Sequence, residues 1–210
     1  MKKLFFEYRG IGMNRFVPWV VELVILPAVL VMLYRKYGPG LEFGGKALYF
    51  FLLLLPMFTA WWNICILQQY VENEGNEIYF LYKRSKLGTV LKHLILYCIP
   101  VCILYGISGF GYRLLWRELP VMLVACFFIN GVIYLFLMLV PSSIMAILLS
   151  VGYPLYVMYF HHGGRRWFIY WYKEEISMEL VLQALLPMLI AAVCFYVAAY
   201  EINIRRRTYS

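Results

Sequence analysis

Six long apolar runs restrict what this chain can fold into more than any other feature. A helix needs about 20 mostly apolar residues to cross the hydrocarbon core of a bilayer, and each run is close to that length. The runs lie near Phe16–Tyr34, Ala47–Leu67, Thr89–Gly109, Leu119–Leu139, Ser142–Phe160 and Glu179–Tyr200. Within lipid a segment must satisfy its own backbone hydrogen bonds, which favours helices. The sequence therefore predicts an all-α, polytopic membrane protein, with a single transmembrane domain of six helices over residues 1–210.

Composition excludes the soluble and nucleic-acid-binding classes. Of the 210 residues, 64% are apolar and only 14% are charged, whereas soluble domains average about 25% charged residues. The net charge of +8 comes from bases scattered between the apolar runs, a distribution typical of membrane orientation and of contact with lipid headgroups. The chain has no Asp, and its five cysteines lie within apolar runs. We therefore expect no metal, cofactor or disulfide in this chain.

The basic residues also predict an orientation. Lys and Arg are more frequent in the short loops on the side that carries the N-terminus, and loops rich in bases stay in the cytoplasm. We expect a multi-pass protein of the cell (inner) membrane with both termini in the cytoplasm. Residues 1–15 mix bases with Leu, Phe and Tyr, which predicts an interfacial helix on the cytoplasmic leaflet and no cleavable signal.

One junction between runs is ambiguous. Pro141, at the Val140–Ser143 junction, is compatible with a tight turn between two spans or with a kink inside one long helix. A turn is favoured, because the stretch from Leu119 to Phe160 is far too long for one span.

Two connecting segments have a marked composition. In the predicted cytoplasmic segment 68–88, acids come first, apolar and aromatic residues follow, and bases come last. The residues concerned are Glu72, Glu74, Glu77, Ile78, Phe80, Leu81, Tyr82, Lys83 and Arg84. This charge order suits a short helix, which either lies on lipid or docks into a groove of a soluble partner. The outer segment 161–178 combines Arg with Trp, Tyr and Phe, which predicts anchoring at the membrane interface or contact with cargo.

These features together resemble the membrane (permease) subunit of a type-2 ATP-binding-cassette (ABC) exporter. The shared features are six spans, an amphipathic N-terminal helix, a charged helix between spans two and three, and an aromatic outer segment. The stretch from Glu72 to Ser85 is similar to that family's coupling-helix region, in which acids and a Gly precede an apolar turn. The family's usual Pro before the third span is absent, and Lys83 and Arg84 occupy that neighbourhood.

The resemblance implies partners and a mechanism. The residues named above between Glu72 and Arg84 would contact a separate cytoplasmic ABC ATPase that binds ATP and Mg²⁺, so this chain would not itself be an enzyme. A second permease copy, or a similar permease, would complete the transporter. The pair would export an amphiphilic peptide, a lipid or a hydrophobic drug by alternating access.

Three polar residues inside the runs are candidates for the translocation path: Glu22, Asn63 and Asn130. An ionisable residue within a span is a functional candidate by default. Glu22 can reach toward the inner surface, pair with Arg15 or a neighbouring chain, or line the path. The two asparagines can instead join helices to one another.

Other readings compete with transport. A membrane scaffold would bind a partner through Glu72–Lys86 and transport nothing. A rhomboid-like serine protease would use Ser108 of Gly106–Gly109 with His161 or His162. Two further motifs fail. Gly40–Ala47 nearly matches a phosphate-binding loop, but Ala47 stands where a hydroxyl is needed, so we expect a Gly-rich turn there. Glu174-Glu175 lacks the later histidines that a membrane metalloprotease needs.

Overall fold

The computed structural model describes residues 12–71, 86–113, 115–160 and 185–208. Over these ranges the chain is helical apart from short turns, and the described residues contain no strand. The first rod consists of η1 (Gly12–Phe16, a 3-10 helix), α2 (Val17–Val20), η2 (Val21–Ile25, a π-helix) and α3 (Leu26–Tyr37). The remaining helices are α4 (Leu41–Phe58), α5 (Trp61–Val71), α7 (Leu87–Gly111), α8 (Leu115–Leu139), α9 (Ser143–Phe160) and α11 (Leu186–Thr208). The predicted all-α class is confirmed for this part of the chain.

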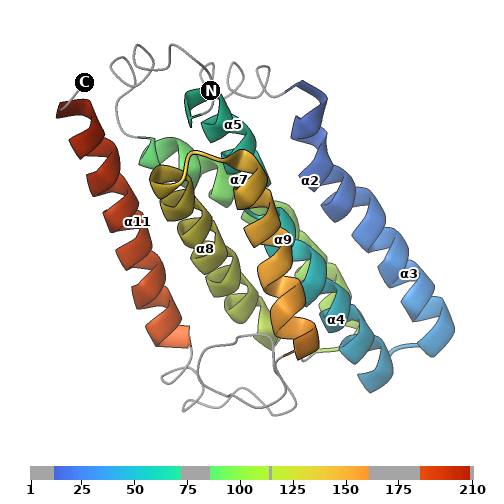
Figure 1. Ribbon diagram of the computed structural model, residues 1–210. Helices are drawn as coiled ribbons and strands as arrows, with labels where there is room; N and C mark the ends of the chain where they lie inside the picture. Colours follow the sequence, from blue (N-terminus) through green and yellow to red (C-terminus); the bar gives the residue numbers. More distant parts are fainter. Residues whose placement is uncertain (1–11, 72–85, 114, 161–184, 209–210) are drawn as a thin grey trace.

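The helices lie side by side in one bundle and run alternately up and down (Figure 1). The first rod forms one flank and α11 the other. α11 packs mainly on α8, α7 also packs on α8, and both α3 and α9 pack on α4. The start of the first rod, the end of α5, the start of α7 and the end of α11 share one end of the bundle, which we call the terminal end. The α3–α4 and α7–α8 turns lie at the opposite end, the far end.

Five helical stretches are long and apolar enough to cross a membrane. They are Gly12–Tyr37, Leu41–Gln68, Leu87–Gly111, Leu115–Leu139 and Leu186–Arg205. Each overlaps one of the predicted spans. The predicted fifth span corresponds to α9, whose apolar stretch Ser143–Tyr156 is shorter than these. A sixth crossing therefore stays a prediction.

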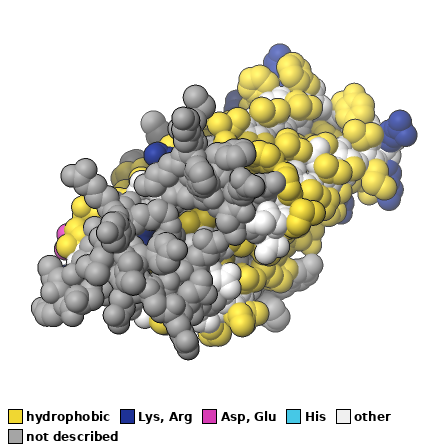
Figure 2. Space-filling model, turned by 90° about the horizontal axis from the view of Figure 1, so that it is seen from above, with side chains coloured by type: hydrophobic (Ala, Val, Ile, Leu, Met, Phe, Trp, Pro, Cys, Tyr) yellow, Lys and Arg dark blue, Asp and Glu magenta, His cyan; other side chains and the backbone are white. Residues whose placement is uncertain are grey.

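The outer surface of the bundle is apolar, as a lipid-facing surface must be. On α7, Ile95, Ile99, Ile103 and Ile107 recur every four residues and are 53–63% exposed, so they form one stripe along the helix. Hydrophobic side chains also dominate the part of the surface that Figure 2 shows outside the grey atoms, with Lys and Arg at its edges. In water such a stripe would be an aggregation site, whereas in a bilayer it is solvated by acyl chains.

Two junctions are clear in the structure. Residues 140–142 form a turn, and Ser142 Oγ accepts a hydrogen bond from the Met145 amide (3.4 Å) at the start of α9. The predicted turn between two helices is therefore confirmed over the kink.

At the α3–α4 junction the expected Gly-rich turn over Gly40–Ala47 is wrong, because α4 already begins at Leu41. Only Gly38 (φ +67°) and Gly40 (φ +148°) take the backbone conformations that favour glycine. Gly44 lies inside α4, where a Cβ atom would come within 2.0 Å of Tyr112 Cδ1. Gly44 is therefore needed for close packing and not for a turn, and a helical segment offers no loop for a phosphate.

Candidate functional site

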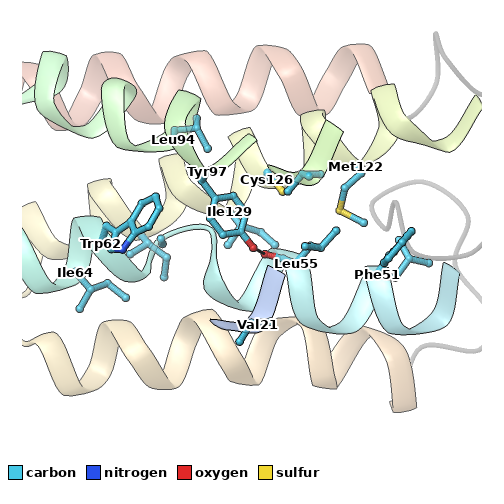
Figure 3. Close-up of a cluster of buried hydrophobic side chains, with 14 of the residues drawn as sticks. Val21, Phe51, Leu55, Trp62, Ile64, Leu94, Tyr97, Met122, Cys126 and Ile129 are labelled. Atoms are coloured by element: carbon cyan, nitrogen blue, oxygen red, sulfur yellow. Dashed lines mark hydrogen bonds between the residues drawn. The ribbon is translucent and has the colours of Figure 1, made fainter. Parts of the chain in front are cut away.

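The second span is broken near its middle. α4 contains Pro56 and ends at Phe58, and α5 begins at Trp61. A proline removes one backbone donor and disturbs the helix around it. Two carbonyls at the break accept hydrogen bonds from side chains of other helices. The hydroxyl of Tyr97 on α7 donates to the Leu55 carbonyl (Figure 3), and Nδ2 of Asn130 on α8 donates to the Thr59 carbonyl (3.0 Å). The irregular backbone is thus held by α7 and α8.

Asn63 and Asn130, two of the predicted path residues, contact each other. Asn63 Nδ2 donates to Asn130 Oδ1 (3.2 Å) and lies 3.4 Å from the Val90 carbonyl. The hydroxyl of Tyr196 on α11 donates to the same Asn130 oxygen (3.0 Å), and the Phe127 carbonyl lies 3.3 Å away as an alternative acceptor. These bonds join α5, α7, α8 and α11. Interhelical amide bonds of this kind stabilise membrane bundles, so both asparagines join helices.

Glu22, the third predicted path residue, faces the interior of the bundle. Its side chain is fully buried, and neither carboxylate oxygen has a hydrogen-bond partner among the described residues. It therefore does not reach out to the surface. The side chain of Arg15, one of the suggested partners, lies outside the described residues. An ionised carboxylate without donors or a counter-ion is very costly in an apolar interior. An ionised Glu22 is therefore costly in the described bundle unless a cation accompanies it.

Local backbone geometry helps to place Glu22. It lies in the π-helical turn Val21–Ile25, between Pro18 and Pro27. π-Helical turns inside α-helices occur frequently at functional sites. Its described electrostatic neighbours are the thiols of Cys98 on α7 and Cys126 on α8. The first rod contacts α7 directly through η2, and Cys126 of α8 lies near enough to Glu22 to interact with it electrostatically.

Two more oxygen atoms near the helix break are buried and unsatisfied by any described residue: Thr59 Oγ1 and Asn63 Oδ1. Thr59 also neighbours Cys126, the residue that interacts with Glu22. We call Glu22, Thr59, Asn63 and Asn130 the central polar site. Its hydrogen-bond acceptors outnumber the donors available to them in this part of the structure.

Aromatic rings surround the same level of the bundle. The ring of Trp62, next to Asn63 in α5, has edge-on neighbours in Trp19 (6.0 Å between ring centroids), Tyr97 (6.2 Å) and His93 (6.3 Å). Trp62 and Tyr97 are fully buried (Figure 3). Aromatic faces carry partial negative charge and attract cations. Acceptor oxygens and aromatic rings together suit a positively charged group.

The predicted partner-binding residues lie outside the described residues: Glu72, Glu74, Glu77, Ile78, Phe80, Leu81, Tyr82, Lys83 and Arg84. The same holds for the outer segment 161–178 and for most of the N-terminal interfacial segment. Of the two helices that flank residues 72–85 in the sequence, α5 ends and α7 begins at the terminal end of the bundle (Figure 1).

The protease hypothesis gains no support from the described residues. Ser108 Oγ is buried and lies 2.7 Å from the Leu104 carbonyl and 3.3 Å from the Tyr105 carbonyl, so its hydroxyl bonds to its own helix. His161 and His162 lie outside the described residues. Within the described ranges no group of three His, Cys, Asp or Glu side chains could hold a metal ion, and Cys65, Cys98, Cys102, Cys126 and Cys194 are free thiols.

Sequence reasoning missed Thr59 of the site and two tyrosines that bond to Asn130 or to the backbone at the helix break. Tyr97 and Tyr196 are two of 19 tyrosines, and nothing in their local sequence separates them from tyrosines that face lipid. Thr59 could have been noticed as a polar residue three positions after Pro56, because a proline disturbs the helix around it.

The fold and the site define a class: an all-helical, membrane-embedded bundle with a buried polar centre. Comparison with known protein families, with curated proteins and with solved structures finds no match to this chain.

Proposed function

We propose that this chain is the permease subunit of an ATP-driven ABC exporter of type 2, with six spans and both termini in the cytoplasm. One observation carries the proposal: α5, which precedes residues 72–85, ends at the terminal end, and α7, which follows them, begins there, as does the first rod, and α11 ends there (Figure 1). In the proposed architecture both chain ends lie in the cytoplasm. A segment that couples to a cytosolic ATPase must therefore lie on the same side of the membrane as the two ends.

The composition of that segment supports the same conclusion. In this segment acids come first, apolar residues follow and bases come last. This order suits a helix with an apolar face, because the helix dipole favours acids at the N-terminus and bases at the C-terminus. Such a helix can seat in a groove of a soluble partner. Glu72, Glu74, Glu77, Lys83 and Arg84 would pair with charges of the ATPase. Ile78, Phe80, Leu81 and Tyr82 would fill its groove.

The broken helices inside the bundle supply a means of moving. ATP-driven closure of the ATPase would shift the end of α5 and the start of α7. The α4–α5 break at Thr59 and the π-helical turn at Glu22 are points where a span can bend without losing a full ladder of hydrogen bonds. Two such permeases would then alternate between inward-open and outward-open states and export an amphiphilic peptide, a lipid or a hydrophobic drug.

The test is co-purification from the cells that naturally produce the protein. The tagged full-length chain is extracted in mild detergent, and the proteins that accompany it are identified by mass spectrometry. The triple charge reversal Glu72→Lys, Glu74→Lys and Glu77→Lys is compared with Glu42→Lys, which reverses an exposed acid in the first turn of α4 at the far end.

We expect an ABC ATPase with the wild-type chain and with Glu42→Lys, and its loss from the triple variant. An ATPase retained by the triple variant would refute coupling through this segment. A partner set without an ATPase would favour the scaffold alternative and overturn the proposal.

A further inference from the structure

The central polar site has more acceptors than donors, and this imbalance points to what it binds. Both oxygens of Glu22, Thr59 Oγ1 and Asn63 Oδ1 are buried without a hydrogen-bond partner in the described part of the bundle. Buried acceptors normally have donors. A guest that brings N–H donors and a positive charge would satisfy these acceptors, whereas an anion would repel the ionised carboxylate of Glu22 and a neutral acceptor could bond only to the Thr59 hydroxyl.

Among the described residues, no positively charged side chain has a described interaction with Glu22. The titratable groups with a described electrostatic interaction with Glu22 are the thiols of Cys98 on α7 and Cys126 on α8. Neither thiol carries a positive charge in any protonation state. On α7, Nδ1 of His93 lies 2.7 Å from the Thr89 carbonyl of its own helix. The helix break contributes Thr59, whose side chain is uncharged.

A proton is the one cation that the closed bundle can hold on Glu22 without extra space. The side chain is fully buried, so a larger guest needs the helices to separate first. The aromatic rings of Trp19, Trp62 and Tyr97 at the same level suit a guest with a cationic head. The apolar surroundings suit the tail of an amphiphile.

We propose that the central polar site binds the cationic amine head of an amphiphilic substrate through Glu22, and that Glu22 exchanges a proton for this head. In the closed bundle the carboxyl is protonated. When the helices separate, its O–H bond breaks, the proton leaves to water, and the carboxylate oxygens accept N–H bonds from the incoming ammonium group. Thr59 Oγ1 and Asn63 Oδ1 provide further acceptors.

This proposal rests on the proposed transport function, because it names the class of cargo. Its test uses the purified full chain in phosphatidylcholine nanodiscs, without ATP or an ATPase. The outcome is therefore independent of whether an ATPase couples to residues 72–85.

Calorimetry measures the binding of octylammonium, with octanol as the uncharged control and with empty nanodiscs subtracted. Repeating the titration in two buffers of different ionisation enthalpy reports the proton release. Three variants are compared: Glu22→Gln, Glu22→Asp, and Glu118→Gln, which alters a half-buried acid near the start of α8 at the far end.

We expect saturable binding of octylammonium with release of a proton, and no saturable binding of octanol. Glu22→Gln should weaken the binding about tenfold or more and abolish proton release. Glu22→Asp and Glu118→Gln should keep both. If Glu22→Gln fails to fold, the test rests on the wild type and Glu22→Asp, in which octylammonium binding must be saturable and accompanied by proton release while octanol binding is not. Unchanged binding in Glu22→Gln, equal binding of octanol, or binding without proton release would overturn the proposal.

Discussion

Replacing Asn130 with leucine, which is similar in size, tests whether the central polar site holds the bundle together. Asn130 takes part in three interhelical bonds, with Thr59, Asn63 and Tyr196. Interhelical hydrogen bonds in membrane proteins contribute about 0.6 kcal/mol each on average, so Asn130→Leu should cost about 2 kcal/mol. Asn63 and Tyr196 each keep a longer alternative acceptor, at 3.4 Å and 3.3 Å, which limits the loss to this size.

The assay is reversible unfolding in mixed detergent micelles, followed by circular dichroism. Ser108→Ala is the matched control, since it removes a buried hydroxyl that bonds only within its own helix, and its cost should be about 1 kcal/mol or less. The double variant with Tyr196→Phe should show a coupling energy of about 0.6 kcal/mol. A cost for Asn130→Leu no greater than that of Ser108→Ala, or no coupling, would refute the argument.

Three further predictions concern the packing of Gly44, the partners of Glu22 and the lipid-facing surface of α7. Gly44→Ala should destabilise by about 1–3 kcal/mol, because its Cβ would meet the Tyr112 ring, whereas Gly45→Ala, with nothing within 4 Å, should be neutral or stabilising in the same unfolding assay. Glu22→Gln should leave the free energy of unfolding within about 1 kcal/mol of the wild type, because the carboxyl has no described partner to lose; a larger loss would reveal a structural bond. Ile103→Lys should cost about 3 kcal/mol on insertion, measured as the membrane-inserted fraction, if its exposed face of α7 contacts lipid; normal insertion would contradict that placement.

The positions of the helices were predictable because apolar length is a strong constraint in lipid. The predicted span Leu119–Leu139 lies within α8, and the prediction of a turn at Pro141 holds. The start of α4 was not predictable, since Gly44, Gly45 and Lys46 are typical of a turn. Tertiary packing of Gly44 against Tyr112 decides this case, and no local pattern encodes a contact across 68 positions of the chain.

The candidate site was predictable in part. Glu22, Asn63 and Asn130 stand out as polar residues within apolar runs, and the structure buries all three. Their relationships were not predictable, because the face of a span that points inward depends on its neighbours. A π-helical turn at Val21–Ile25 and the break after Phe58 change those faces locally. Tyr97 and Tyr196 became visible as partners only through their hydrogen bonds.

The central claim is that residues 72–85 seat in a cytosolic ATPase, and photo-crosslinking tests it most directly. A photoreactive amino acid is placed at Phe80 within that segment, and in a control chain at Tyr49, an exposed residue of α4. The account predicts that the Phe80 probe captures an ABC ATPase in intact cells and that the Tyr49 probe does not. Capture of only lipid or of other membrane proteins from Phe80, or equal capture of the ATPase from both positions, would contradict it.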